Sequence, residues 1–187
     1  MKIFSFFVCS VALVFASCGD SNASTNGQDS ATGDTTQEVE KIGEEKRSAW
    51  EYTESVDEMT DKTAYFATVY SENSVDFDFP YDGGSTLSFT IRQSPQYGND
   101  MYIHISKGQF NSGISGTKIK VRFDDNDPIP VNCTTPSDYS SDILFLKGFD
   151  KLLKHLKESK TMKINVEFFN EGAHTFTFDV NGIECNH

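Results

Sequence analysis

Residues 161–180 read TMKINVEFFNEGAHTFTFDV, and this stretch decides the class of fold. Apolar and polar side chains alternate twice in it, first from Met162 to Phe168 and again from Phe176 to Val180. A period of two is typical of a strand with one buried and one solvated face. The turn signal Asn170-Glu171-Gly172 lies between the two runs. We therefore predict an antiparallel hairpin.

The same alternation recurs along the chain upstream of this hairpin. Three further clear runs cover residues 75–79, 87–91 and 119–123. Weaker candidates for strands are Trp50–Ser55, Thr63–Tyr70, Asp100–Ser106, Ile129–Cys133 and Asp142–Leu146. One segment differs, because Phe149, Leu152, Leu153 and Leu156 follow the i, i+3, i+4, i+7 spacing of an amphipathic helix. The pattern predicts a mainly β domain, an antiparallel β-sandwich or roll of about 8–10 strands with that one helix.

Residues 1–17 have the features of an export signal. Lys2 supplies the positive charge, and the apolar run from Ile3 to Ala16 is 14 residues long. That run is shorter than the roughly 20 residues that span a bilayer. Its end, Phe15-Ala16-Ser17-Cys18, resembles the lipobox of bacterial lipoproteins, in which the cysteine is lipidated. We expect a lipid anchor on Cys18 in the bacterial cell envelope, in the outer membrane of a Gram-negative cell. An ordinary secretory signal is the alternative.

Residues 18–47 contain almost no large apolar side chain, with Val39 and Ile42 as the exceptions. Such a segment cannot bury enough surface to offset its ordering entropy, so we expect a disordered tether. The folded domain is then residues 48–187, with Trp50 as its first apolar anchor. The whole chain has 16 Lys and Arg against 28 Asp and Glu, a net charge of −12. This acidic balance argues against nucleic acid as a partner.

The four cysteines divide between the signal, the anchor and the domain. Cys9 lies in the signal and Cys18 at the expected lipidation site, which leaves Cys133 and Cys185 for the domain. The envelope favours disulfide bonds, and a bridge between Cys133 and Cys185 would close a loop of about 50 residues. The sequence does not show whether the two side chains meet. Two buried free thiols are therefore the alternative.

The histidines and the longest acidic run do not form a metal-binding motif. His104, His155, His174 and His187 lie in different expected elements, and no two of them have metal-ligand spacing. Asp124-Asp125-Asn126-Asp127 lacks the later glycine and glutamate of an EF-hand loop, so we interpret it as a polar turn. We expect neither a metal nor another cofactor.

Catalytic motifs are also not evident. The chain contains no Gly-x-Ser-x-Gly sequence around a nucleophilic serine. Its acidic residues are numerous, but Asp76, Asp78 and Glu167 fall on expected solvated strand faces. We therefore expect a non-catalytic protein. A cell-wall hydrolase that uses two carboxylates is the alternative.

A candidate binding face carries four basic side chains. They are Arg92, Lys118, Lys120 and Arg122, on the polar faces of two expected strands. On an acidic protein, such a basic patch can bind another envelope component, either a protein or a glycan. The alternative is that these charges protect an edge strand from aggregation.

Several short motifs, taken in order, resemble a known family. They are Trp50, Asp57-Glu58-Met59-Thr60-Asp61, Leu87-Ser88-Phe89-Thr90-Ile91-Arg92, Met101-Tyr102-Ile103-His104-Ile105, Val121-Arg122-Phe123-Asp124, the leucine helix, and the run from Thr175 to Ile183. Their order resembles the TagO/VasI family of envelope proteins associated with type VI secretion. The resemblance implies an accessory or binding role in a secretion apparatus and carries over no catalytic residue. Gln93 departs from it, because many members have a cysteine there, so the resemblance does not settle the disulfide pattern.

Overall fold

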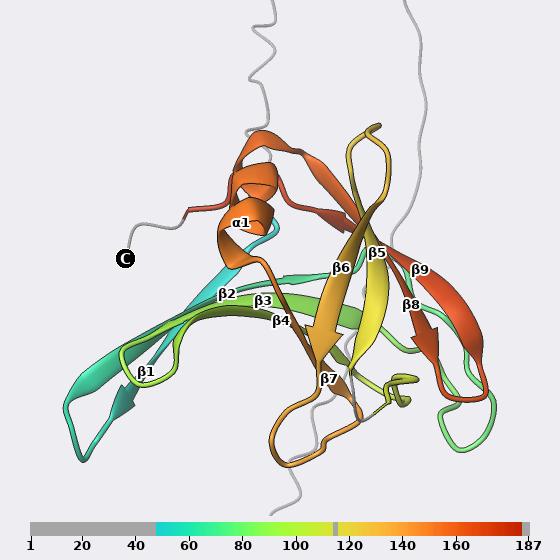
Figure 1. Cartoon of the computed structure of the whole chain (residues 1–187), viewed down its shortest axis with the longest axis horizontal. Coiled ribbons are helices and arrows are strands. Elements are labelled where there is room, and N and C mark those ends of the chain that lie inside the picture. Colours follow the sequence, from blue (N-terminus) through green and yellow to red (C-terminus); the bar gives the residue numbers. More distant parts are fainter. Residues whose placement is uncertain (1–47, 114–115, 185–187) are drawn as a thin grey trace, which may run out of the picture. The chain divides into compact units, whose positions relative to one another are not determined.

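Nine strands and one helix form the part of the chain that the computed structural model describes, residues 48–113 and 116–184 (Figure 1). The strands are β1 (Glu51–Asp57), β2 (Lys62–Tyr70), β3 (Leu87–Ser94), β4 (Gly98–Ile105), β5 (Thr117–Phe123), β6 (Ile129–Thr134), β7 (Ile143–Leu146), β8 (Thr161–Phe168) and β9 (Gly172–Asp179). The helix α1 spans Phe149–Glu158. The prediction of a mainly β fold with one amphipathic helix is confirmed for these residues.

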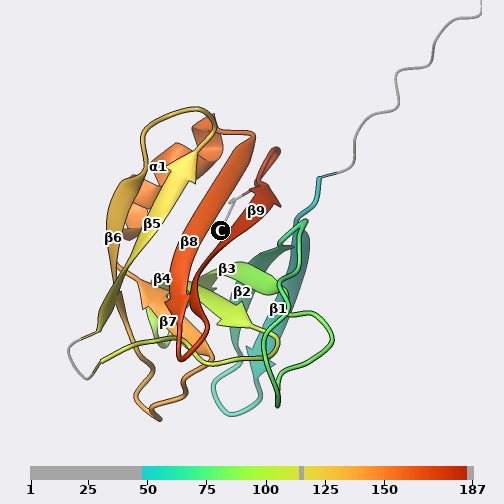
Figure 2. The same ribbon diagram turned by 90° about the vertical axis from the view of Figure 1, so that its right-hand side faces the viewer.

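All nine strands belong to one antiparallel sheet, in the order β1-β2-β3-β4-β7-β6-β5-β8-β9. The predicted hairpin is present as β8 and β9, in which Met162 pairs with Phe178 and Ile164 with Phe176. In its turn, Asn170 and Gly172 have φ angles of 61° and 76°, which suit these two residue types. Figures 1 and 2 show that the sheet bends over on itself, so that β5, β6, β8 and β9 cross β2, β3 and β4. This single antiparallel sheet agrees with the predicted β-sandwich or roll.

The apolar faces of the strands enclose one core. The largest fully buried side chains come from six strands and the helix: Phe89, Phe168, Phe176, Phe178, Leu87, Ile91, Met101, Ile103, Ile105, Ile119, Leu144 and Leu156. The helix contributes Leu152 and Leu156, both from the predicted apolar stripe. Trp50 is 5% exposed and donates its indole N–H to the carbonyl of Val180 at 3.1 Å. The first described residues are thereby joined to the end of the last strand.

One predicted strand, residues 75–79, is wrong. Only Val75 pairs with another backbone, through two hydrogen bonds with Ser85 at 3.0 and 2.7 Å. Phe77 is buried, but Phe79 is 86% exposed, so the alternation of apolar residues does not continue as an alternation of burial. The amide of Tyr81 donates to the carbonyl of Asp78 at 3.0 Å, which turns the chain. A β-strand forms through backbone pairing along its length, but this segment pairs only at Val75, so it is not a strand.

The two edges of the sheet differ. The outer edge of β9 is covered by residues 71–73, because the amide of Glu72 donates to the carbonyl of Thr177 at 2.8 Å. The side chain of Asn73 accepts the Thr177 amide at 2.8 Å and donates to the carbonyl of Thr175 at 3.1 Å. The other edge strand, β1, pairs with β2 alone within the described residues. As far as residues 48–113 and 116–184 show, the sheet therefore has one covered edge and one open edge.

The export signal, the lipidation site Cys18 and the tether, as predicted from the sequence, all lie outside the described residues. Within the part of the chain that is described, no helix has the length and apolar character needed to cross a membrane.

Candidate functional site

The predicted basic face does not exist as a single surface. Arg92 lies on β3, whereas Lys118, Lys120 and Arg122 lie on β5. Strands β4, β7 and β6 separate β3 from β5 in the sheet. Alternation along a strand shows which residues share a face of that strand, but it does not show which strands are neighbours. Grouping Arg92 with the other three was therefore wrong.

The three basic residues of β5 do not protect an edge. Strand β5 pairs with β6 on one side and β8 on the other, so edge protection does not explain them. Arg122 is opposite Lys163 of β8 and pairs with Asp125 at 3.2 Å. Exposed pairs of this kind contribute little to stability. These side chains form a solvated face of the sheet, to which β8 adds a further lysine.

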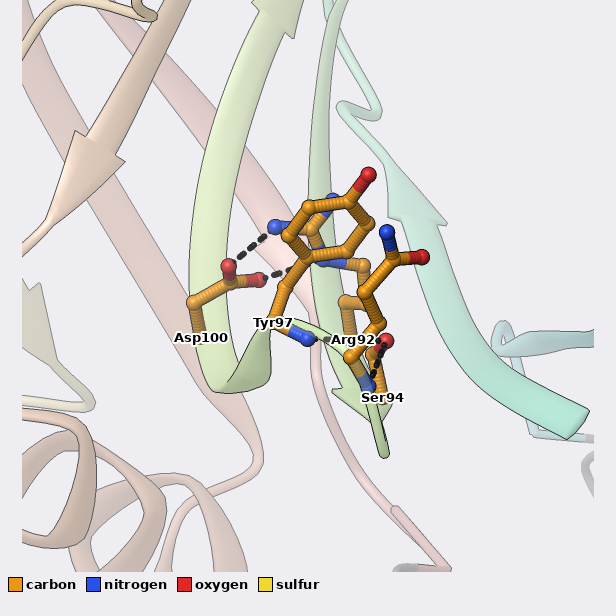
Figure 3. Close-up of polar contacts among 5 residues, drawn as sticks. Arg92, Ser94, Tyr97 and Asp100 are labelled. Carbon is orange, nitrogen blue, oxygen red and sulfur yellow. Dashed lines mark hydrogen bonds and ion pairs between the residues drawn. The ribbon is translucent and has the colours of Figure 1, made fainter. Parts of the chain in front are cut away.

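Arg92 has a different environment, in which aromatic and acidic groups hold its side chain (Figure 3). Its guanidinium forms two contacts with the Asp100 carboxylate, one of them between Nε and Oδ1 at 3.0 Å. The guanidinium carbon lies 4.9 Å from the centre of the Tyr97 ring and 5.7 Å from that of Phe145. A guanidinium over an aromatic face is attracted by the ring quadrupole. Arg92 therefore positions the Tyr97 ring and is itself neutralised by Asp100.

The turn that carries Tyr97 is fixed by a second group. The hydroxyl oxygen of Ser94 accepts the amide N–H groups of Gln96 at 3.2 Å and of Tyr97 at 3.3 Å. Tyr97 nevertheless remains 65% exposed. An exposed aromatic ring that is already ordered loses little entropy when a ligand covers it. Tyr97 and Arg92 line two depressions in the surface, of about 160 and 480 Å³.

The smaller depression borders the hairpin of β1 and β2, which we call the β1–β2 ribbon (residues 51–70). Ser55 and Asp57 of β1, together with Ala64 and Phe66 of β2, line this depression opposite Tyr97. In Figure 1 the ribbon extends at the left beyond the neighbouring turn of β3 and β4. Every residue of β1 except Asp57 is exposed. The ribbon therefore offers an open strand edge beside a preformed depression.

The charge of the ribbon is strongly negative. Residues 51–62 include five acidic side chains, Glu51, Glu54, Asp57, Glu58 and Asp61, and one basic side chain, Lys62. The amide of Met59 donates to the Asp57 carboxylate at 2.8 Å, and this hydrogen bond is the largest cause that lowers the pKa of Asp57. Hydrogen bonds to the charged form favour ionisation. Asp57 therefore stays charged to a lower pH than an ordinary aspartate does.

The polar turn predicted at residues 124–127 is confirmed as the connection between β5 and β6. The carboxylate of Asp124 accepts the amide N–H groups of Thr161 at 2.8 Å and of Lys160 at 3.0 Å. The Thr161 amide is the largest cause that lowers the pKa of Asp124. Asp124 thus ties this turn to the start of β8. The Asp124 carboxylate oxygen therefore serves as a hydrogen-bond acceptor that holds the fold together.

The described histidines lie in separate places. His104 is 3.6 Å from Asp142, His155 stacks on Phe123 at 5.1 Å, and His174 lies at the edge of the core against Phe77. His187 lies outside the described residues. Within residues 48–113 and 116–184, no group of three His, Cys, Asp or Glu side chains is placed to hold a metal ion.

A paired-carboxylate mechanism needs one acid whose pKa is raised. Asp57 and Asp124 have a lowered pKa instead, with backbone amides as the main cause. Asp57 is the acid that lines the smaller depression, and Asp100, which lines the larger one, is engaged by Arg92. Neither depression therefore offers the pair of acids that the hydrolase alternative requires.

The cysteine pairing stays a prediction. Cys133 is a free thiol on β6 and is 3% exposed, which gives the bridge no support. Its expected partner, Cys185, lies outside the described residues. Burial raises the pKa of the Cys133 thiol to about 12.

No model of a protein family matches the chain, and no curated protein or solved structure matches it. The resemblance to the TagO/VasI family therefore stays a prediction from short motifs.

Proposed function

We propose that this protein is a non-catalytic binding domain of the bacterial envelope that takes up an extended segment of another protein along β1. The observation that carries the proposal is the open edge of β1, a seven-residue strand exposed on both faces. The predicted lipid anchor on Cys18 would hold this domain at a membrane. An accessory component of a secretion apparatus would be one kind of protein with this binding function.

An open strand edge presents backbone N–H and C=O groups that another strand can pair with. Proteins commonly cover such edges, as residues 71–73 do for β9 here. On β1, Tyr52 and Val56 lie on the same face of the ribbon and are 47% and 53% exposed. A strand added beside β1 would place its own alternate side chains next to these two. Backbone pairing would supply affinity, and the side chains would supply selectivity.

Charge selects the kind of segment. The five acidic residues of the ribbon repel a second copy of this acidic chain and attract a basic segment. The depression of about 160 Å³ beside the ribbon, with Ala64, Phe66 and Tyr97 in its wall, has room for one side chain of that segment. The expected partner is therefore a protein with a basic, extended stretch.

A photo-crosslinking amino acid placed at Val56 in the anchored full chain is expected to capture a polypeptide in cells. The same amino acid at Lys163, an exposed position on β8, is the matched control and should capture roughly tenfold less. Mass spectrometry of the adduct identifies the crosslinked segment. Recovery of secretion-apparatus subunits would support the accessory role in secretion that the TagO/VasI resemblance implies.

Charge reversal provides the second arm of this experiment. Glu51→Lys with Glu54→Lys should lower the yield of the Val56 adduct roughly tenfold, because both changes repel a basic segment. Asp127→Lys with Glu158→Lys alters the net charge equally at exposed positions away from the ribbon and should leave the yield unchanged. Equal yields from Val56 and Lys163, or equal effects of the two double variants, would refute pairing along β1.

The anchor has its own test. Cys18→Ser removes the sulfur that would carry the lipid, so this variant should leave the membrane fraction and appear in the soluble fraction. Immunoblots of the two fractions measure the change, with Cys9→Ser as the control because Cys9 lies within the expected signal. Retention of the Cys18→Ser variant in the membrane fraction would contradict a lipid anchor at this position.

A further inference from the structure

We propose that a third depression, formed by residues 109–113, Thr135, residues 139–141 and Phe169, binds a neutral saccharide. This depression has a volume of about 380 Å³, within the usual range for small-molecule sites. It shares no residue with the two depressions at Tyr97. The proposal goes beyond protein binding at the ribbon and does not depend on it.

The lining of this depression carries no charge. Charged residues make up 24% of the chain, yet none of the ten lining residues is Asp, Glu, Lys or Arg. Its polar side chains are hydroxyls and amides, from Gln109, Asn111, Ser112, Thr135, Ser140 and Ser141. Asn111 donates to the Glu167 carboxylate at 3.4 Å and Ser140 to that of Asp142, so their oxygens remain as acceptors. Hydroxyl and amide groups of these kinds can pair with sugar hydroxyls, which both donate and accept hydrogen bonds. The lining holds no Lys or Arg that would favour a phosphate or a carboxylate group on the ligand.

Two exposed aromatic rings border the same depression. Tyr139 is 82% exposed and Phe169 is 57% exposed. Leaving a large apolar side chain in water forgoes roughly 1.5–3 kcal/mol of burial, so folding gains little from either ring. The C–H face of a pyranose can cover an aromatic ring while its hydroxyls bond to the polar side chains. The combination of bare rings and neutral polar groups thus fits a sugar.

The backbone at Tyr139 supports the same conclusion. Its φ angle is 60°, in the left-handed region that side chains larger than Asn seldom adopt. Such a conformation costs of the order of 1–3 kcal/mol, and strained residues concentrate at functional sites. A glycine at this position would relieve the strain, but it would also remove the ring. The protein keeps the costly residue at a position where its ring gains little burial.

The floor of the depression is rigid before any ligand arrives. The amide of Phe110 donates to the carbonyl of Ser141 at 2.7 Å, and the amide of Phe169 donates to the carbonyl of Gln109 at 2.8 Å. Phe110 is 3% exposed and stacks on Phe168 with ring centres 5.1 Å apart. These contacts join the three lining segments. Preorganisation of this kind reduces the entropy cost of binding.

A glycan array tests the proposal with the full chain carrying Cys18→Ser. The array presents neutral oligosaccharides, with sialylated and sulfated ones as charged comparators. We expect binding to at least one neutral oligosaccharide, and calorimetry with that sugar should show at least a tenfold loss of affinity in Phe169→Ala and Tyr139→Gly. Phe79→Ala removes a ring that is 86% exposed and lines none of the three depressions, so it should change the affinity less than twofold.

Thermal unfolding separates loss of the site from loss of the fold. Tyr139→Gly should leave the melting temperature unchanged or raise it, because the glycine adopts the positive φ without strain. Reduced affinity together with unreduced stability assigns the ring to ligand binding. Binding only to charged sugars, no binding to any neutral sugar, or undiminished affinity in both variants would each overturn the proposal, whatever the crosslinking at β1 shows.

Discussion

Trp50→Ala is expected to lower the free energy of unfolding by about 3–5 kcal/mol, the usual cost of deleting a buried aromatic side chain. Trp50 is 5% exposed, and its ring meets Phe89 edge-on with centres 6.1 Å apart. Its indole N–H bonds to the carbonyl of Val180 at 3.1 Å. Alanine would leave a cavity and a carbonyl without this donor, so packing and hydrogen bonding are lost together.

Urea unfolding followed by circular dichroism measures this effect. Tryptophan fluorescence is unsuitable, because Trp50 is the single tryptophan of the chain. Trp50→Phe is the matched control, since it keeps an aromatic ring and removes the indole donor. It should cost about 1–2 kcal/mol, mostly from the unpaired carbonyl. A loss below roughly 1 kcal/mol in Trp50→Ala would mean that Trp50 does not join the first strand to the last.

The second large effect concerns the reactivity of Cys133. Burial raises the pKa of its thiol from 9.0 to about 12. Only the thiolate reacts with alkylating reagents, so three pKa units correspond to about a thousandfold lower reactive fraction near pH 8. Labelling of the folded protein should therefore be about a thousandfold slower than labelling of the urea-unfolded chain. Limited access to the buried sulfur adds to this protection.

The labelling rate of Cys133 should also depend on pH. Because the pKa is raised in the folded protein, its labelling rate should rise about tenfold per pH unit between pH 8 and pH 11. The unfolded chain should level off above about pH 10, where its thiol is almost fully ionised. The full chain with Cys9, Cys18 and Cys185 all replaced by Ser isolates the Cys133 signal. Equal rates for folded and unfolded chains would contradict a buried thiol.

The predicted disulfide between Cys133 and Cys185 can be tested directly. A mass measurement of the unmodified chain under non-reducing conditions distinguishes a Cys133–Cys185 disulfide from two thiols. The structure supports the free form at Cys133, where the sulfur lies in the core of the sheet. A reduced mass after oxidising purification would therefore agree with the structure, and an oxidised mass would require Cys185 to reach β6.

The two proposed binding surfaces differ in chemistry. The ribbon is acidic and offers backbone groups along an edge, which suits a basic extended segment. The depression at Tyr139 and Phe169 is uncharged and offers aromatic faces, which suits a sugar. A domain held at a membrane could use both, contacting a protein through one surface and a glycan through the other. The two experiments can fail independently, because they probe different residues.

Local patterns in the sequence determined most of the secondary structure. The alternation from Met162 to Phe168 predicts β8, in which Met162, Ile164, Val166 and Phe168 are all buried. The leucine spacing predicts α1, because an apolar stripe with a period of 3.6 residues can face the core only as a helix. These features depend on neighbours within a few residues, so the sequence by itself contains them.

Tertiary structure decided which strands are neighbours, and with them the candidate sites. The sequence pattern groups Arg92 with the basic residues of β5, but three strands separate them and the Asp100 carboxylate pairs with Arg92. The open edge at β1 and the depression around Tyr139 depend on how distant segments meet when the sheet closes. Alternation reports which side of a strand is dry, whereas strand order depends on the whole chain. The sequence therefore determined the elements, and only the folded sheet decided which surfaces they expose together.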